Sequence, residues 1–285
     1  MSRVDVPRTT LLCLDTLNHE LAARALSRSL EACRFERAVF LTDRPVMVPG
    51  VEVVAVPVIS GRDDYSERVL RGLLPFVDTE FALLIQWDGY VLNGDAWTDS
   101  FLQYDYIGAR WWHPSGGNVG NGGFSLRSRR LLKAVIAAGT SLSDAETENE
   151  DEAICRRLRG RLEVEYGLRF APENVADLFS IERVGLNPRP FGFHGLFNMA
   201  ERVNAGELDW FCRRVPASAW RSREFFEFIV ALEARGRTLE ARRIAAFVEQ
   251  RLGPERCRSL LEETRSLAVR RLRVRALPQR GQVES

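Results

Sequence analysis

The chain has 285 residues, of which 45% are hydrophobic, enough to build one large α/β domain, alone or with a helical appendage. The formal net charge is +1, so no long-range field attracts nucleic acid or an anionic membrane. No apolar stretch approaches the ~20 residues that cross a bilayer, and we expect no transmembrane segment.

The first residues predict the beginning of a parallel α/β sheet. Residues 9–14 form a short apolar run typical of a buried strand, and residues 19–33 carry apolar side chains at a helical spacing. Residues 37–42 and 51–56 predict two further strands. A strand, helix, strand, strand order favours a sheet covered by helices over an all-β fold.

The middle of the chain continues this alternation. Residues 81–87 predict a fully buried, central strand. The other elements expected here are helices at 63–76, 129–138 and 152–159, short strands at 104–109 and 124–126, an acidic connection at 141–151, and weaker strands at 169–172 and 177–184. We therefore predict an α/β fold with a mixed, mostly parallel sheet flanked by helices.

Beyond residue 203 the pattern becomes helical. Helices are expected at 225–235, 239–252 and 254–273, with Gly236 and Gly253 between them. These helices could shape a ligand site, bind a partner or form a homodimer interface. A solvated helix face is the favoured interpretation of the arginine-rich residues 265–275, ahead of contact with anionic lipid. We expect three parts, an α/β domain at 1–202, a C-terminal helical region at 203–277 and a disordered tail at 278–285.

Missing motifs exclude several kinds of site. The chain has a single lysine, Lys133, and no G-x-x-x-x-G-K-[ST] phosphate loop. It also lacks the G-x-G-x-x-G, H-E-x-x-H and G-x-S-x-G motifs. The five cysteines contain no C-x-x-C pair, which indicates reduced thiols rather than a zinc site or a disulfide framework. With no signal-peptide core at residues 1–5, we expect a cytoplasmic protein.

Asp88 directly follows the predicted central strand. Ligands of open α/β sheets bind at this carboxyl edge of the strands. Asp88 is either a turn acid before Gly89 or a ligand of Mg²⁺ or Mn²⁺, ions that prefer oxygen ligands and hold substrate phosphates. Asp95 is a possible second ligand and equally a turn residue. We favour the metal site.

Residues 120–127 combine three glycines with one amide. Missing side chains let the backbone approach a ligand closely. We therefore predict that Asn121, Gly122 and Gly123 contact a bound ligand. An ordinary turn would instead need one glycine at a positive φ angle.

Two later segments carry further candidates. His194 lies between glycines and aromatic residues, and it is either a packed, hydrogen-bonded ring or a further metal ligand. Glu150 and Asp151 lie at the start of a predicted helix. Acids there either compensate the helix dipole or supply a base that deprotonates an acceptor hydroxyl, and both interpretations stay open.

Four residues nearer the N-terminus are candidates for nucleotide contacts. Asp15, Thr16 and Asp43 follow the first two strands and are either turn residues or partners of a base and ribose. Arg68, one helical turn after Asp64, is a candidate diphosphate partner because guanidinium matches phosphate geometry.

Four segments in order, QWDGYV at 86–91, GNGGFSLRS at 120–128, NEDEAI at 149–154 and FGFHG at 191–195, resemble the GT-A glycosyltransferases. They are especially similar to a glycosyltransferase-like bacterial and fungal family of unknown function. The resemblance covers roughly residues 8–200. It implies a GT-A-like, Rossmann-like catalytic domain that uses a nucleotide sugar.

The resemblance also implies roles for individual residues. Asp88 takes the first position of an Asp-x-Asp motif that binds the metal and the diphosphate, and Tyr90 replaces the second acid. Residues 121–123 resemble a donor-sugar loop. Asp151, with Glu150 beside it, takes the place of an acceptor-activating base, and His194 is similar to a late metal-binding histidine.

These observations together predict a glycosyltransferase that is metal-assisted through Mn²⁺ or Mg²⁺ and inverting. It would move a sugar from a UDP-sugar to a hydroxyl of a glycan, small molecule or protein. The alternative is a non-catalytic protein that binds a nucleotide or a glycan on the same fold.

Overall fold

The computed structural model describes residues 3–111, 116–139, 149–183, 187 and 189–276. The chain divides into two compact units, residues 1–195 and 196–285. The expected tail at 278–285 and most of the expected acidic connection at 141–151 lie outside the described residues.

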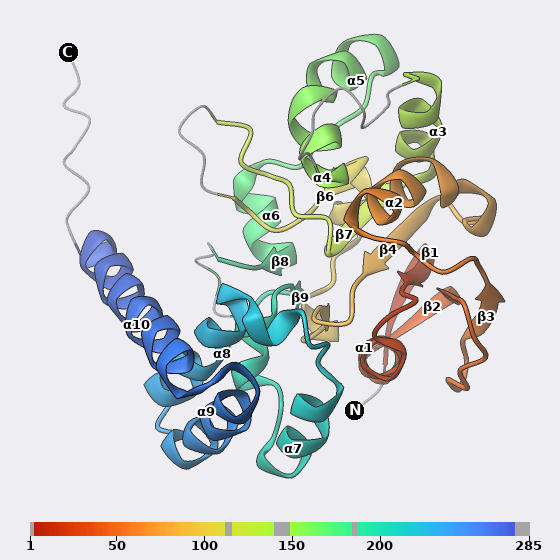
Figure 1. Ribbon diagram of the computed structural model, residues 1–285. Coiled ribbons are helices and arrows are strands. Elements are labelled where there is room, and N and C mark those ends of the chain that lie inside the picture. Colours follow the sequence, from red (N-terminus) through yellow and green to blue (C-terminus); the bar gives the residue numbers. More distant parts are fainter. Residues whose placement is uncertain (1–2, 112–115, 140–148, 184–186, 188, 277–285) are drawn as a thin grey trace, which may run out of the picture. The chain divides into compact units, whose positions relative to one another are not determined.

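A six-stranded sheet forms the centre of the first unit (Figure 1). Its strands are β1 (Val4–Leu14), β2 (Cys33–Thr42), β3 (Glu52–Ala55), β4 (Phe81–Ile85), β6 (Tyr106–Ile107) and β7 (Phe124–Ser128). They lie in the order β3-β2-β1-β4-β7-β6. Strands β1 to β4 pair in parallel, and β7 runs antiparallel to both of its neighbours. The expected mixed, mostly parallel sheet is confirmed.

Helices cover this sheet and connect its strands. They are α1 (His19–Ala32), α2 (Arg62–Glu67), α3 (Arg129–Ala137), α4 (Glu150–Glu152), α5 (Arg159–Tyr166) and α6 (Glu173–Phe179). Two short 3₁₀ turns, Gly94–Ala96 and Asp99–Gln103, precede β6 in the chain. The helix expected at 63–76 is divided, because a π-helical turn at Arg68–Gly72 and a 3₁₀ turn at Leu74–Phe76 follow α2. A second π-helical turn, Ala153–Arg157, joins α4 to α5.

Two buried clusters hold these helices to the sheet. One packs the apolar side chains of β1, β2 and β4 against the segment that follows α2, through residues such as Leu12, Leu84 and Val69. The other packs α3 and α5 around Tyr106 of β6. Because β4 and residues 9–14 of β1 are fully buried, both segments are apolar runs, as expected for central parallel strands, whereas residues 4–8 of β1 include the exposed Asp5 and Arg8.

A second, three-stranded sheet has the order β5-β9-β8, with β5 at Tyr90–Val91, β9 at Gly192–Phe193 and β8 at Ser180–Ile181. The strand expected at 177–184 is therefore wrong over its first part. Residues 177–179 end α6, which starts after Pro172 and buries Ala176 and Phe179 at helical spacing. The strand expected at 169–172 is reduced to an isolated bridge between Tyr106 and Phe170.

The second unit is helical. A 3₁₀ segment, Leu196–Glu201, precedes α7 (Ala205–Arg214), a 3₁₀ turn at Ala219–Arg221, α8 (Arg223–Ala234), α9 (Thr238–Leu252) and α10 (Pro254–Ala276). Its core includes the buried rings of Phe211, Phe225, Phe226 and Phe228. The three expected helices and the C-terminal helical extension are confirmed, and α7 was not predicted. No helix in the described residues has the length and apolar character needed to cross a membrane.

Candidate functional site

Asp88 lies at the carboxyl edge of the main sheet, three residues after the end of β4. Its side chain is buried, with 6% of the residue exposed. Among the described residues, Asp88 Oδ1 has no hydrogen-bond partner, but it lies 3.4 Å from Nε2 of His194. An acid and an imidazole 106 positions apart in the sequence therefore form a buried pair.

The small sheet brings His194 to this position. Strand β5, which begins two residues after Asp88, pairs with β9, which ends directly before His194. The backbone N–H of Gly195 donates to the carbonyl of Asp88 at 3.1 Å, which closes the pairing. Gly89 is required here because a Cβ atom would lie 2.8 Å from the carbonyl oxygen of Phe193.

Polar side chains surround the imidazole. Nε2 of His194 is 3.1 Å from Oε1 of Gln86, and Nδ1 is 3.1 Å from Nδ2 of Asn121 and 3.7 Å from Oε1 of Glu182. Burial disfavours the charged ring, yet the carboxylates of Asp88 and Glu182 raise the pKa of His194 well above its ordinary value. Two acids therefore face the ring, Asp88 at Nε2 and Glu182 at Nδ1.

Asn121 begins the glycine segment in a left-handed conformation, with φ at 55°. It is the non-glycine residue that adopts the positive φ angle expected of a glycine in a turn. Gly122 and Gly123 instead provide space. A Cβ atom on Gly123 would lie 2.1 Å from Nε2 of His194, and one on Gly122 would lie 2.3 Å from Oε1 of Glu150.

The acids at the start of α4 meet the same segment. Asp151 Oδ2 accepts the backbone N–H of Gly122 at 2.8 Å, and Oδ1 accepts the N–H of Glu152 at 2.9 Å. Glu150 is more deeply buried, 3.5 Å from Nη2 of Arg127. Burial and the charge of Asp151 raise the pKa of Glu150 to about 7.

Arg127 is a fully buried cation on β7. Its Nε donates to Oγ of Ser125 at 3.0 Å, and its guanidinium lies over the ring of Tyr106, 5.5 Å from the centroid. Burial lowers the pKa of Arg127, but electrostatic interaction with Tyr106, Glu150 and other titratable neighbours outweighs it and raises the pKa overall. Arg127 therefore supplies the buried counter-charge of Glu150.

The three candidates after β1 and β2 lie at the same sheet edge as Asp88, because β1 is parallel to both β2 and β4. Asp15 Oδ1 accepts the backbone N–H groups of Leu17 and Asn18, at 2.7 and 2.6 Å. Oγ1 of Thr16 accepts the N–H of Ile59 at 2.9 Å.

Asp43 and Arg68 are engaged within the protein. Asp43 Oδ1 lies 2.6 Å from Nε2 of His19, and this hydrogen bond lowers the pKa of Asp43. Arg68 donates from Nε and Nη2 to the two oxygens of Asp64, at 2.7 and 3.1 Å. It also donates to the carbonyl oxygens of Pro57 and Val58.

The residues around the core of the site that the sequence did not identify are Gln86, Glu182, Arg127 and Tyr65. Gln86 donates from Nε2 to the hydroxyl of Tyr65 at 2.8 Å. Gln86 could have been identified from the sequence because it begins the QWDGYV segment. Arg127 could have been identified because it is a single charged residue within a buried strand. Glu182 follows a two-residue strand and had no signal.

The remaining site contact is Tyr90, which takes the second motif position. It is buried and packs edge-on against Phe193, with ring centroids 4.8 Å apart. Its hydroxyphenyl ring therefore belongs to the packing between β5 and β9. No group of three or more His, Cys, Asp and Glu side chains suited to a metal ion occurs in the described part of the chain.

Residues 56–194 match a family model described as Protein of unknown function (DUF5672), a segment that includes the site from Tyr65 to His194. A search of curated proteins finds no match. Among solved structures, TarS 1–349 of S. aureus is similar, with TM-score 0.39 and 11% identity over 97% of this chain and 94% of that one.

Two glycosyltransferase structures are also similar. One is the apo form of GlyE from Streptococcus pneumoniae TIGR4, with TM-score 0.39 and 12% identity over 66% of this chain. The match spans 54% of the GlyE chain. The other takes part in glycosylation of the major capsid of PBCV-1, with TM-score 0.40 and 15% identity over 65% of this chain and 93% of that one.

Proposed function

We propose that this protein is a glycosyltransferase that moves a sugar from a UDP-sugar to a hydroxyl acceptor with inversion. The observation that carries the proposal is the meeting of two acid groups across one glycine segment. Asp88 and His194 lie on one side of residues 122–123, and Asp151 binds the backbone of Gly122 on the other. A glycosyltransferase needs a group that binds the donor diphosphate and a base that takes the proton of the acceptor hydroxyl, and the two must lie close together.

Asp88 and His194 fit part of a site for Mg²⁺ or Mn²⁺. Asp88 Oδ1 is buried without a hydrogen-bond donor, and His194 Nε2 faces it. Hard divalent ions take about six ligands, so the donor diphosphate and water would complete the set. When bound, the ion supplies positive charge to the departing diphosphate.

Asp151 is the proposed general base. Backbone N–H groups of Gly122 and Glu152 fix its carboxylate, which leaves lone pairs for an acceptor hydroxyl. The base takes the hydroxyl proton as the acceptor oxygen bonds to the anomeric carbon and the bond to the nucleoside diphosphate breaks. Glu150 lies behind it, and we assign to it the role of holding Arg127 and the start of α4.

The test is the Asp151→Asn variant assayed with a donor that supports turnover of the wild type. The change keeps the side chain's shape and removes the base, so turnover should fall by about 10²–10⁴-fold, with donor affinity nearly unchanged. Wild-type turnover in the variant would contradict the assignment and make Glu150 the next candidate. Nucleotide-sugar binding without turnover of any donor by the wild type would favour the non-catalytic alternative.

A further inference from the structure

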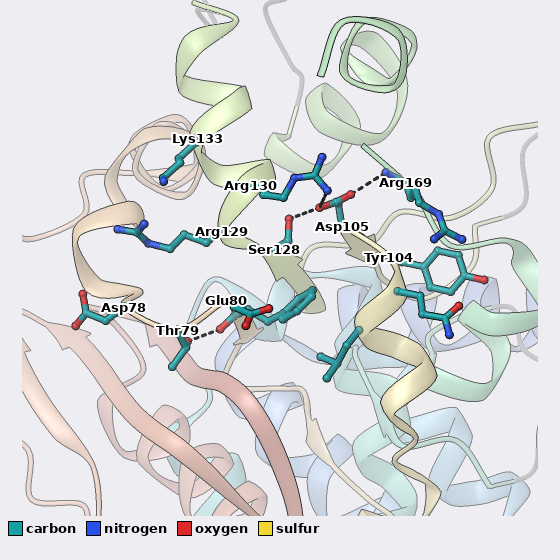
Figure 2. Close-up of a pocket in the computed structure, with 13 residues that line it drawn as sticks. Asp78, Thr79, Glu80, Tyr104, Asp105, Ser128, Arg129, Arg130, Lys133 and Arg169 are labelled. Atoms are coloured by element: carbon teal, nitrogen blue, oxygen red, sulfur yellow. Dashed lines mark hydrogen bonds and ion pairs between the residues drawn. The ribbon is translucent and has the colours of Figure 1, made fainter. Parts of the chain in front are cut away.

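A cavity of about 500 Å³ opens in the first unit, away from the site described above (Figure 2). Residues 78–81 and 102–105 form two of its walls, ahead of β4 and β6. Residues 128–130 and Lys133 form a third, where β7 ends and α3 begins, and Arg169 completes it. This volume falls in the range of small-molecule sites, ~300–1,000 Å³.

The sheet keeps this cavity apart from Asp88. In the antiparallel β4–β7 pair, Phe81 lies opposite Ser128 at the cavity, and Ile85 lies opposite Phe124 next to the glycine segment. The two ends of β4 are four residue steps apart, roughly 13 Å. The cavity is thus a separate site on the opposite sheet edge.

Four cationic side chains line the cavity, namely Arg129, Arg130, Lys133 and Arg169. Figure 2 shows Arg129 and Lys133 on one side, Arg130 beside Asp105, and Arg169 beside Tyr104. Lys133 is exposed and has no ion-pair partner among the described residues. The guanidinium of Arg169 lies over the Tyr104 ring, 5.3 Å from its centroid.

Two of the three acids in the wall pair with arginines from outside this set, although Arg37 also binds Glu52. Asp78 is paired with Nη1 of Arg37 at 2.7 Å, and Glu80 is paired with Nη1 of Arg8 at 3.1 Å. The three acids of the wall are also fewer than its four cations, so the wall keeps a net positive charge.

The third acid, Asp105, is largely occupied by neutral donors. Its Oδ1 accepts the hydroxyl of Ser128 at 2.5 Å, and its Oδ2 accepts the backbone N–H of Arg169 at 2.9 Å. Nη1 of Arg130 lies 3.7 Å from Oδ1, beyond hydrogen-bond distance. The wall consequently carries an excess of positive charge. Part of it is held by the backbone, since Arg129 Nε donates to the carbonyl of Val77 and Arg130 Nη2 to the carbonyls of Tyr166 and Gly167.

We propose that this cavity binds a phosphate-bearing small molecule. A phosphate group carries about two negative charges and three acceptor oxygens, which suits several convergent guanidinium and ammonium donors. Arginine forks bind phosphate oxygens in pairs, and a lysine adds a point charge. This inference does not rest on the proposed function, because the two sites share no residue.

The single lysine of the chain gives a local test. An amine-reactive acetylating reagent labels Lys133 and the α-amino group, and mass spectrometry of the peptides follows each label separately. Inorganic pyrophosphate should slow acetylation of Lys133 at least about fivefold and leave the α-amino group unaffected. Sodium chloride at the same ionic strength should give no such protection.

Variants complete the test. Arg169→Gln should raise the pyrophosphate concentration for half-protection about tenfold or more, because it removes a charge-assisted hydrogen bond. Arg258→Gln, which removes an exposed helix cation of the second unit, and Asp88→Ala should leave that concentration unchanged. Equal protection by chloride, or wild-type protection in Arg169→Gln, would overturn the proposal.

Discussion

The ring of His194 occupies the space that a side chain at residue 123 would fill. Its nitrogens then lie within reach of Gln86, Asn121 and Asp88. The φ angle of Gly123 lies outside the left-handed region that favours glycine. At the residue scale, this glycine is thus needed for the position of the imidazole rather than for a bend.

Gly123→Ala should therefore displace His194 and weaken binding of a UDP-sugar with its metal by about tenfold or more. Thermal stability should fall less than in a core truncation, because the ring is at the edge of the packed interior. Gly160→Ala is the matched control, since a Cβ atom there meets nothing within 4 Å. Calorimetry beside a thermal melt separates the effects, and intact donor binding with a large loss of stability would show an ordinary structural glycine.

The raised pKa of Glu150 predicts that the free energy of unfolding depends on pH. Its pKa is raised to about 7, so between its unfolded value and pH 7 the folded state keeps a proton that the unfolded state releases. Stability from this group is complete at low pH and decreases as pH rises toward 7, by at most ~1.4 kcal/mol per pH unit.

In Glu150→Gln the free energy of unfolding should therefore change less between pH 5 and 7 than in the wild type. Urea unfolding at several pH values measures the slope. The exposed Glu255→Gln variant should keep the wild-type slope. Equal slopes in Glu150→Gln and the wild type would mean that this carboxyl is ionised throughout.

At the scale of elements, apolar runs were sufficient to predict β4 and the buried C-terminal parts of β1 and β2, since buried parallel strands need no alternation. The partly exposed first residues of β1 and β2 gave no such run and were not predicted. The same reasoning gave a strand at 177–184, where a helix of seven residues ends in a two-residue strand. In elements this short, too few apolar side chains are present to distinguish the spacing of a helix from that of a strand. The pairing of β5 with β9, which joins Asp88 to His194, is a contact between distant segments and left no local pattern.

Arg68 holds the loop before α2, residues 57–61, in place. Its guanidinium binds Asp64 and the carbonyls of Pro57 and Val58, while Thr16 holds Ile59. The π-helical turn that starts at Arg68 lies directly behind this loop. All of these contacts of Arg68 are to protein atoms.

Arg68→Gln should speed amide hydrogen exchange in residues 57–61 severalfold, because three of its contacts are to that loop or its anchor. Mass spectrometry of the peptide measures this, with Arg71→Gln, one turn on, as the matched control. Unchanged exchange together with weaker binding of UDP would contradict the tether and support the predicted diphosphate contact.

At the scale of the whole molecule, two units with separate cores follow one another along the chain, and the proposed chemistry belongs to the first. The change from alternating strands and helices to helices alone could be predicted from the sequence because a helical spacing of apolar residues continues over α8 and α9. The candidate residues Asp88, Gly123 and Asp151 could be chosen from motif order. Glu182, which faces His194, and Arg127, which faces Glu150, could not be chosen in this way, since these contacts arise only when sheet and helices pack.

The measurement that bears most directly on the central claim is the thermal stabilisation of the protein by UDP, with and without Mn²⁺, in the wild type and in Asp88→Ala. At about 100 times its dissociation constant, a ligand of the folded state adds ~2.7 kcal/mol to the unfolding free energy. We predict that the wild type gains most of this stabilisation only when Mn²⁺ is present, and that Asp88→Ala loses the Mn²⁺-dependent part while melting as one folded protein. The same Mn²⁺-dependent gain in both proteins would contradict the account.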